Sequence, residues 1–338
     1  MESETHLNMS VKKRHSTTFL DKSLLHEDMP ASCYANLDWN LYWSLEHQAH
    51  RDLAYLLQAP CLLASNDEFD VVSSETFSVW FTQYKDWIVE DAKDPQPLLD
   101  FVNTPRQYKL GLYAEDLLLY FLEHQSEYSL LLHDRQVFRG KQCIGSMDFL
   151  IQTPTGQVEH WEMAIKFFLQ RTPSLDWIDF VGPSHVDSMH RKLTKMVGRQ
   201  LNLCDTPEAK ELLAHLSLPL PTAKKVLSVG RFFGQYDVHF LPPKGCDPNQ
   251  PQGHWIKRKA FSELFFDSTA LWKVRLHPLW IAPYLTTERT ELLTTQEVLN
   301  TPMEKEKFLM LSQMKIVANG YQEYHRWILV IDDWGVHD

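Results

Sequence analysis

The chain has 338 residues, of which 44% are hydrophobic and 12% aromatic, with 12 Gly and 18 Pro, and this composition excludes disordered, collagen-like and low-complexity proteins. Its net charge of −11, from 33 Lys and Arg against 44 Asp and Glu, argues against nucleic-acid binding over the whole surface. The longest apolar stretch, Leu117 to Leu122, is far shorter than the ~20 residues of a membrane span, and the five Cys form no CxxC pair, so we expect a soluble, cytoplasmic protein without membrane contact.

The first 104 residues are acidic and mostly helical in pattern. Residues 1–30 are polar and aperiodic, which is typical of a disordered tail. Within residues 31–104, apolar side chains recur at helical spacing, first from Leu37 to Leu57 and then from Glu75 to Ile88. Residues 16–104 contain 4 Lys and Arg against 15 Asp and Glu, which equals the net charge of the whole chain. We therefore expect an acidic helical region that offers a surface to a protein partner.

Residues 105–204 begin and end with helical patterns and have strand-like patterns between them. Apolar residues return every three to four positions in the outer segments, whereas the three inner segments have the patterns of strands. Ser184, followed by Asp187 three residues later, predicts the N-terminal cap of the last helix. The expected elements are helix Lys109–His124, strands Tyr128–Arg139, Gln142–Gln152 and Gln157–Leu169, and helix Val186–Cys204.

Residues 205–338 are expected to be rich in strands and to pack on the preceding core. Their segment 224–259 carries seven Lys and Arg against two Asp, a local net charge of +5. The whole pattern predicts an α/β fold in which a mixed central sheet is flanked by helices. The expected C-terminal strands are Lys225–Phe240, Ile256–Phe266, Trp272–Pro283 and Trp327–Asp332, with a helix near Glu288–Leu299.

Several widespread enzyme motifs are missing from the chain. It has no GxGxxG, GxxxxGK[ST], GxSxG or HExxH motif, so dinucleotide-binding, P-loop, serine-hydrolase and zincin functions lack their minimal sequence signals. The 16 His show no ligand spacing with another His or Cys. A function must therefore be sought in carboxylates and lysines.

The segment Thr153-Pro154-Thr155-Gly156 predicts a tight hairpin turn. Pro suits the second position of a type I turn, and Gly suits the left-handed conformation that follows in a three-residue loop. With 154–156 as the loop, Thr153 pairs with Gln157. Counting outward along the two strands then places Asp148 directly opposite Glu162.

This register divides the hairpin into an apolar face and a polar face. Two carboxylates on the polar face lie ~5 Å apart at their β-carbons, which favours a hard divalent cation between them. The alternative is that the polar face is only the solvated side of an antiparallel sheet. The apolar face contains Met147, Phe149, Ile151, Trp161, Met163, Ile165 and Phe167, and the polar face contains Ser146, Asp148, His160, Glu162, Ala164 and Lys166.

Glu115 is a third candidate acid. On the preceding helix it falls in the row Leu112, Glu115, Leu119, which is apolar apart from the Glu itself. A carboxylate on a buried face needs a partner. The alternative is a residue at the edge of the apolar stripe that reaches solvent.

The run from GLYAEDLL through GSMDFLI and HWEMAIKFFL to GPSHVDSMHRKL resembles the core of the PD-(D/E)XK nuclease superfamily. It is also similar, over roughly residues 50–335, to an uncharacterised bacterial domain family placed near those nucleases. The resemblance implies a restriction-endonuclease-like core with Glu115 as the helix acid, Asp148 as the aspartate, Glu162 as the acid of the third motif and Lys166 as its lysine. By the same resemblance the three acids hold Mg²⁺ or Mn²⁺, the lysine serves the attacking water or the phosphate, and the protein hydrolyses phosphodiester bonds of nucleic acid.

The spacing of the third motif departs from the superfamily. Three residues separate Glu162 from Lys166 where one is usual, and Ala164 stands at the usual place of the lysine. At ~3.4 Å per residue, Lys166 starts ~13 Å from Glu162 and has to lean back along the strand. In a second interpretation, Ala-Ile-Lys is the motif, and Glu162 replaces its acid from two residues earlier. Gln200 resembles a glutamine that some members carry on the next helix, but Cys204 stands where a tyrosine is expected.

The last helix of this core is also basic. Its candidate nucleic-acid contacts are Arg191, Lys192, Lys195, Arg199 and Gln200. Neutralisation of phosphates is one interpretation of these cations, and an ordinary solvated helix face is the other. For the whole protein, the alternatives to a nuclease are a catalytically degenerate module of the same fold that binds nucleic acid or a protein, and a structural partner that acts through its acidic helices.

Overall fold

One mixed β-sheet organises the part of the chain that the computed structural model describes, namely Tyr34 and residues 37–103, 109–247, 249–266, 268–303 and 307–335. The expected tail, residues 1–30, lies outside these residues. The strands are β1 (Asp70–Val71), β2 (Ser129–Arg139), β3 (Gln142–Gln152), β4 (Val158–Gln170), β5 (Phe180–Val181), β6 (Ala223–Gln235), β7 (Gln252–Lys257), β8 (Leu271–Val274), β9 (Leu285–Thr286), β10 (Leu293–Thr294), β11 (Phe308–Val317) and β12 (Gly320–Val330).

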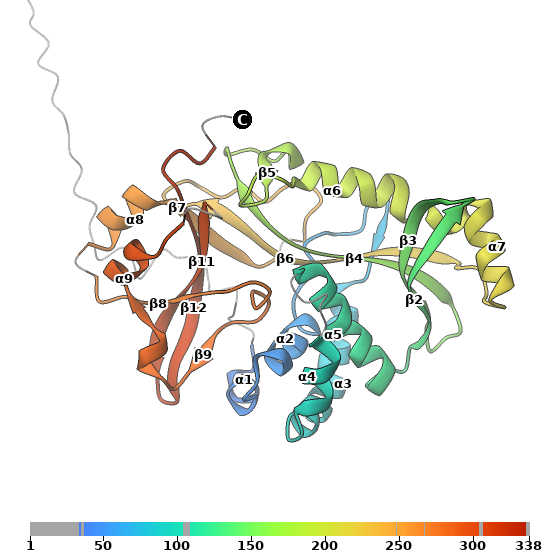
Figure 1. The fold of residues 1–338 in the computed structure, drawn as a ribbon, viewed down its shortest axis with the longest axis horizontal. Helices are drawn as coiled ribbons and strands as arrows, with labels where there is room; N and C mark the ends of the chain where they lie inside the picture. The colour runs from blue at the N-terminus through green and yellow to red at the C-terminus, as the bar shows by residue number, and fades with distance from the viewer. Residues whose placement is uncertain are drawn as a thin grey trace, which may run out of the picture. The chain divides into compact units, whose positions relative to one another are not determined.

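The described strands form a twelve-stranded sheet whose main path is β10-β8-β11-β12-β7-β6-β4-β3-β2 (Figure 1). The centre is parallel, because β4, β6, β7 and β12 all run the same way. Both ends are antiparallel, through β2–β3–β4 on one side and β8–β11–β12 on the other. The fold is thus α/β with a mixed sheet and a strand-rich C-terminal region, as expected from the sequence.

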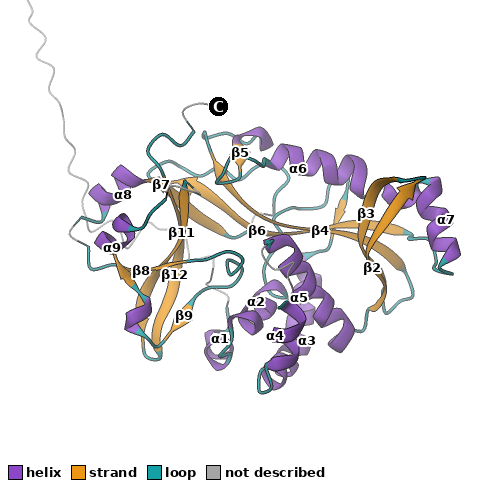
Figure 2. Ribbon diagram, in the orientation of Figure 1, coloured by secondary structure: helices purple, strands orange, loops and turns teal. Residues whose placement is uncertain are grey.

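Helices cover both faces of the central strands (Figure 2). The described helices are α1 (Trp39–Ser44), α2 (Gln48–Leu56), α3 (Ser74–Asp91), α4 (Gln96–Val102), α5 (Leu110–Gln125), α6 (Met189–Lys195), α7 (Pro207–His215), α8 (Arg258–Leu264) and α9 (Thr295–Asn300). Apolar residues of α2 to α5 pack with Trp161, Met163 and Ile165 of β4, and those of α6 pack with Ala164 and Phe168 on the opposite face. Figure 1 accordingly draws α5 and α6 on opposite sides of β4.

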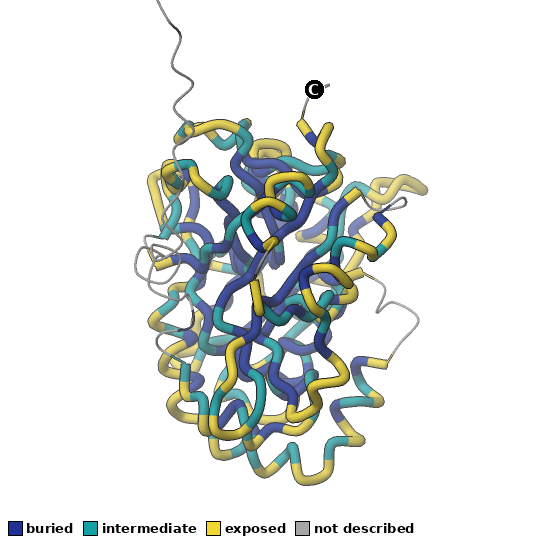
Figure 3. The backbone as a smooth tube through the Cα atoms, turned by 90° about the vertical axis from the view of Figure 1, so that its left-hand side faces the viewer, coloured by how far each residue is buried: buried dark blue, intermediate teal, exposed yellow. Residues whose placement is uncertain are grey.

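The long parallel pair β4–β6 forms the centre of this core. It is paired from Glu159↔Ala223 to Leu169↔Phe233. At Gly230 a Cβ would stand 1.8 Å from the carbonyl oxygen of Lys166, and the residue has a φ of +135°, so only glycine fits here. Buried residues follow these inner strands, whereas exposed residues follow the outer helices and loops (Figure 3).

The hairpin between β3 and β4 has the register predicted from its turn. Thr153 N–H donates to the carbonyl of Gln157 at 2.8 Å, Gly156 has a φ of +84°, and the strands pair from Gln152↔Val158 to Phe149↔Trp161. The seven residues of the predicted apolar face are all buried. The turn at Pro154–Gly156 therefore determines which residues of β3 and β4 lie opposite each other.

Several other expectations were wrong in detail. The predicted strand Ile256–Phe266 is the end of β7 followed by helix α8, because Phe261 and Phe265 lie one helical turn apart and are both buried. The predicted strand Trp272–Pro283 ends at Val274. The predicted helix Val186–Cys204 begins at Met189, and Ser188, not Ser184, caps it by accepting the N–H of Arg191. Strand β11 and helices α4 and α7 were not predicted.

The predicted core and the predicted C-terminal region share this single sheet. Strands β2 to β5 belong to the first region and β6 to β12 to the second, and β6 pairs directly with β4. The boundaries placed at residues 104 and 204 remain predictions. Among the described residues, no helix has the length and apolar character that crossing a membrane requires.

Candidate functional site

The candidate site lies where strands β3 and β4 separate. Their pairing ends at Phe149↔Trp161, and the next positions in register are Asp148 and Glu162. Instead of a ladder hydrogen bond, a carboxylate oxygen of Asp148 accepts the backbone N–H of Met163 at 2.9 Å. The two strands therefore form a fork, hereafter the β3–β4 fork, that holds both carboxylates on the α6 side of the sheet.

Glu162 is completely buried in this fork, and both of its oxygens are engaged. Oε1 contacts His160 Nε2 at 3.0 Å, and Oε2 accepts from Gln200 Nε2 at 2.6 Å. Burial would lower the pKa of His160, but its contacts with Cys204 and Glu162 outweigh this effect and raise the pKa to about 9, so an imidazolium faces Glu162 at neutral pH. Because His160 and Glu162 are both inaccessible to solvent, the alternative of a solvated polar face is wrong.

Asp148 holds more negative charge around it than positive charge. Burial, followed by Glu162 and Glu115, raises its pKa to about 8, while the Met163 N–H and Lys192 act in the opposite direction. A carboxyl group in this setting keeps its proton up to neutral pH unless a cation is supplied.

Glu115 reaches this group of acids from helix α5. It is only half-buried, as are Leu112 and Leu119, whereas Asp116 is buried. The row of Glu115 is therefore the edge of the apolar stripe, as the alternative interpretation held. Its charge nevertheless acts on Asp148.

Two lysines approach the fork from different elements. Lys166 of β4, the lysine predicted from the sequence, forms an ion pair with Asp187. Lys192 of α6 was assigned to a nucleic-acid surface, yet it is half-buried, and its charge acts on both Asp148 and Glu162. Burial, and next the positive charge of Lys166, lower the pKa of Lys192. The structure thus brings Lys192 to the acids and ties Lys166 to Asp187.

A change of helical geometry places Gln200 on Glu162. Directly after α6, residues Met196–Gln200 form a π-helical turn, and such turns occur often at functional sites. The remaining predicted nucleic-acid contacts, Arg191, Lys195 and Arg199, are exposed on this helix. Arg199 also donates to the carbonyl of Ile144 in β3 at 3.1 Å.

Three cations of the basic segment 224–259 are paired or buried. Lys224 pairs with Asp205 at 2.7 Å, and Lys225 pairs with Glu159 at 2.7 Å. Arg231 is buried and donates to Tyr34 Oη at 2.9 Å. These three cations are therefore neutralised or buried, which a count along the sequence cannot show.

One known protein family matches most of this chain. Its model, described as "Domain of unknown function (DUF1853)", matches residues 51–330. The chain belongs to the DUF1853 family. The match includes the whole β3–β4 fork, helix α6 and the C-terminal strands. No match was found among the curated proteins or among the solved structures.

The donors at the fork of this DUF1853 protein suit a hard cation with few protein ligands. In the described part of the chain, no group of three or more His, Cys, Asp or Glu side chains is close enough to hold a metal ion. Mg²⁺ needs no such group, because it keeps several waters and is usually held by one or two carboxylates. Asp148 and Glu162 provide two carboxylates, and the half-buried Glu115 stands beside them. A Mg²⁺ or Mn²⁺ site at these residues stays a prediction.

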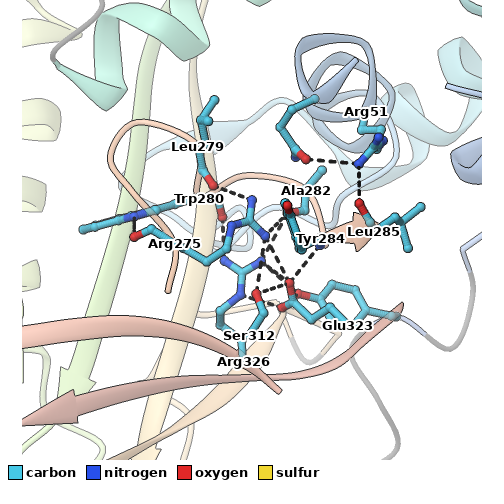
Figure 4. Close-up of polar contacts among 12 residues, drawn as sticks. Arg51, Arg275, Leu279, Trp280, Ala282, Tyr284, Leu285, Ser312, Glu323 and Arg326 are labelled. Atoms are coloured by element: carbon cyan, nitrogen blue, oxygen red, sulfur yellow. Dashed lines mark hydrogen bonds and ion pairs between the residues drawn. The ribbon is translucent and has the colours of Figure 1, made fainter. Parts of the chain in front are cut away.

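A second buried carboxylate in the DUF1853 domain has very different surroundings (Figure 4). Glu323 of β12 accepts from Arg326 at 2.5 and 2.9 Å and from Arg275 at 3.1 Å. Tyr34, Ser312 and the backbone N–H of Tyr284 donate to it as well. Although burial acts to raise the pKa of Glu323, Arg326 and Arg275 lower it to about 2.

Residues missed by the sequence analysis complete the fork. His160 stood on the predicted polar face, two positions before Glu162, and this spacing was the signal that it would lie beside the acid. Asp187 was interpreted as part of a helix cap, but its contact with Lys166 joins α6 to β4. The inward direction of Lys192 had no signal in the sequence beyond its charge.

Proposed function

We propose that this protein is a Mg²⁺- or Mn²⁺-dependent nuclease that hydrolyses phosphodiester bonds of nucleic acid. The observation that carries the proposal is the fork itself, where Asp148 lies beside Glu162 and Glu115 and has a pKa of about 8. Excess buried negative charge is relieved by a divalent cation. The ammonium group of Lys192 acts on the same acids. It can contact a phosphate ester that is also bound to the metal ion, and so stabilise the charge that develops on the phosphate.

Each residue of the fork has a role in this proposal. A bound Mg²⁺ would lower the pKa of a water and stabilise charge on the phosphate. Asp148 and Glu162 would hold the ion, with Glu115 beside them. His160 and Gln200 fix the orientation of the Glu162 carboxylate through one oxygen each, as partners behind metal ligands commonly do.

Nucleic acid is the favoured substrate because of the helix beside the fork. Arg191, Lys195 and Arg199 are exposed on α6 and on the turn that follows it, and exposed cations near a site attract a phosphate backbone. The order helix, three antiparallel strands, helix from α5 to α6 also agrees with the PD-(D/E)XK core that the sequence resembles.

The test combines cation binding with cleavage. We expect wild-type protein to bind Mn²⁺ in a calorimetric titration and to cut at least one of labelled single-stranded DNA, duplex DNA and RNA. Asp148→Asn keeps the acceptor for Met163 but removes the charge, so Mn²⁺ affinity should fall at least about tenfold and cleavage should be lost. Glu123→Gln, an exposed change on the same helix as Glu115, should change neither. Absence of both Mn²⁺ binding and cleavage in the wild type would overturn the proposal.

A module of the same fold that binds nucleic acid without cutting it is the second candidate. The pairing of Lys166 with Asp187 favours it, because the lysine predicted to act is engaged elsewhere. In this case the wild type would bind a labelled oligonucleotide with strong salt dependence but would leave it intact with either cation.

A further inference from the structure

Lys166 is held by a partner in the loop just before helix α6. Its ammonium group pairs with Asp187, and about a third of each side chain is exposed (32% and 34%). Asp187 also accepts the N–H of Ser188 at 3.0 Å, and Ser188 is the N-cap of α6. The ion pair therefore connects β4 to the residue that directly precedes the N-cap of α6.

The space between the two lysines is too small for a substrate. Lys166 and Lys192 line a cavity of about 10 Å³ together with apolar residues of α6 and with Ala164 and Ser228 of the sheet. This is about the volume that a single water requires. A phosphate group therefore does not fit in this cavity, which leaves the side of the acids as its approach to a lysine.

Lys192 is the lysine on that side. Its charge acts on Asp148 and Glu162, and within the described part of the chain it forms no ion pair of its own. It is half-buried, so it stands at the fork and not on the open surface of α6. A lysine ammonium has three donors, which is enough to interact with the acids and to bind a phosphate oxygen.

We infer that Lys192 of α6 is the lysine that contacts the scissile phosphate at this site, and that Lys166 with Asp187 is a positioning pair that holds α6 against β4. This inference rests on the proposed function. It moves the reactive lysine from the strand to the helix and explains the three-residue gap after Glu162. Lys166 does not have to lean back along β4 toward Glu162, because Lys192 makes the contact with the phosphate in its place.

The experiment compares three lysines of matched chemistry in the full-length protein. Lys192→Met should lower kcat/KM for cleavage about 10²–10³-fold, as removal of one donor to developing charge does, and should leave Mn²⁺ affinity no weaker. Lys192→Arg should restore part of the rate. Lys210→Met, an exposed change on helix α7, should change the rate by less than about twofold.

The positioning pair Lys166–Asp187 is tested separately, by comparing the cleavage rates of two single variants and the double variant. Lys166→Met and Asp187→Asn should each lower the rate about tenfold, and the double variant should be no worse than either, because both changes remove one interaction. If Lys166→Met costs more than Lys192→Met, or if the double variant is additive, the inference is wrong while the nuclease stands. If the wild type neither binds Mn²⁺ nor cuts nucleic acid, the proposed function fails and takes this inference with it.

Discussion

Two carboxylates of this sheet, the buried Glu323 and the half-buried Asp148, differ in how their charge is balanced. Glu323 is surrounded by two arginines and three further donors, and its pKa falls to about 2. Asp148 is surrounded by two more carboxylates, and its pKa rises to about 8. The contrast teaches that burial alone does not identify a functional acid. What distinguishes the fork is charge that the protein leaves uncompensated.

The Glu323 cluster joins the C-terminal strands to one another and to Tyr34 near the start of the described chain. Its donors come from β12, β11, the segment after β8 and Tyr34 near the start of the described chain. Arg326 also donates to the carbonyl of Trp280 at 2.8 Å. A buried charge satisfied from so many elements specifies one arrangement of them, so we assign this cluster to structure.

The largest effect expected from this comparison is on stability. Glu323→Gln leaves Arg275 and Arg326 buried without a countercharge, which should lower the free energy of unfolding by about 3–5 kcal/mol. Asp148→Asn replaces a carboxyl group that is mostly protonated at pH 7 and should not lower it. Urea denaturation at pH 7, followed by tryptophan fluorescence, measures both changes.

The control for this prediction is Glu297→Gln. Glu297 is an exposed capping residue of α9, and its loss should cost about 1 kcal/mol. A Glu323→Gln protein as stable as this control would show that the arginines are satisfied without the carboxylate. A large loss in Asp148→Asn would remove the contrast between the two acids.

The second prediction concerns pH. The pKa of Asp148 is about 8 in the fold and ~3.9 in the unfolded chain, so the folded state retains a proton that the unfolded state releases. Stability should therefore fall as the pH rises from about 4 to 8, by at most about 1.4 kcal/mol per pH unit from this group. The Asp148→Asn protein lacks this slope, so the difference between the two free energies of unfolding should grow with pH. Urea midpoints at pH 5, 6, 7 and 8 test this, and a constant difference would contradict the assignment.

The fold around the fork was largely predictable because its determinants are local. Pro154 and Gly156 fix the turn, the turn fixes the register, and the two-residue period of strands then fixes the faces. The same reasoning placed Asp148 beside Glu162 and the apolar face in the core. The helix before the hairpin was also predicted to within one residue at each end, as Leu110–Gln125.

The parts of the site that the sequence did not predict depend on contacts between distant segments. Glu162 is buried because the π-helical turn after α6 places Gln200 on it, and no local pattern encodes that closure. Whether Lys192 faces the acids or the solvent depends on how α6 is rotated against the sheet. The position of Lys166 was known from the sequence, but its partner Asp187 lies 21 residues away and had been assigned to a cap.

The smallest effect on stability is expected from a substitution of His160. This residue contacts Glu162 in the fork and carries the opposite charge. Its pKa is raised to about 9 by contacts with Cys204 and Glu162 that outweigh burial, against ~6.5 in the unfolded chain. Its contribution to stability should therefore be complete below about pH 6.5 and lost as the pH rises through 9. His160→Gln keeps a donor for Glu162 but no charge, so it should lower the free energy of unfolding by about 1–2 kcal/mol at pH 6. The free energies of unfolding of the variant and the wild type should become equal by pH 9.5. Urea denaturation at pH 6 and pH 9.5 measures both, and a difference of the same size at the two pH values would rule out a charged His160.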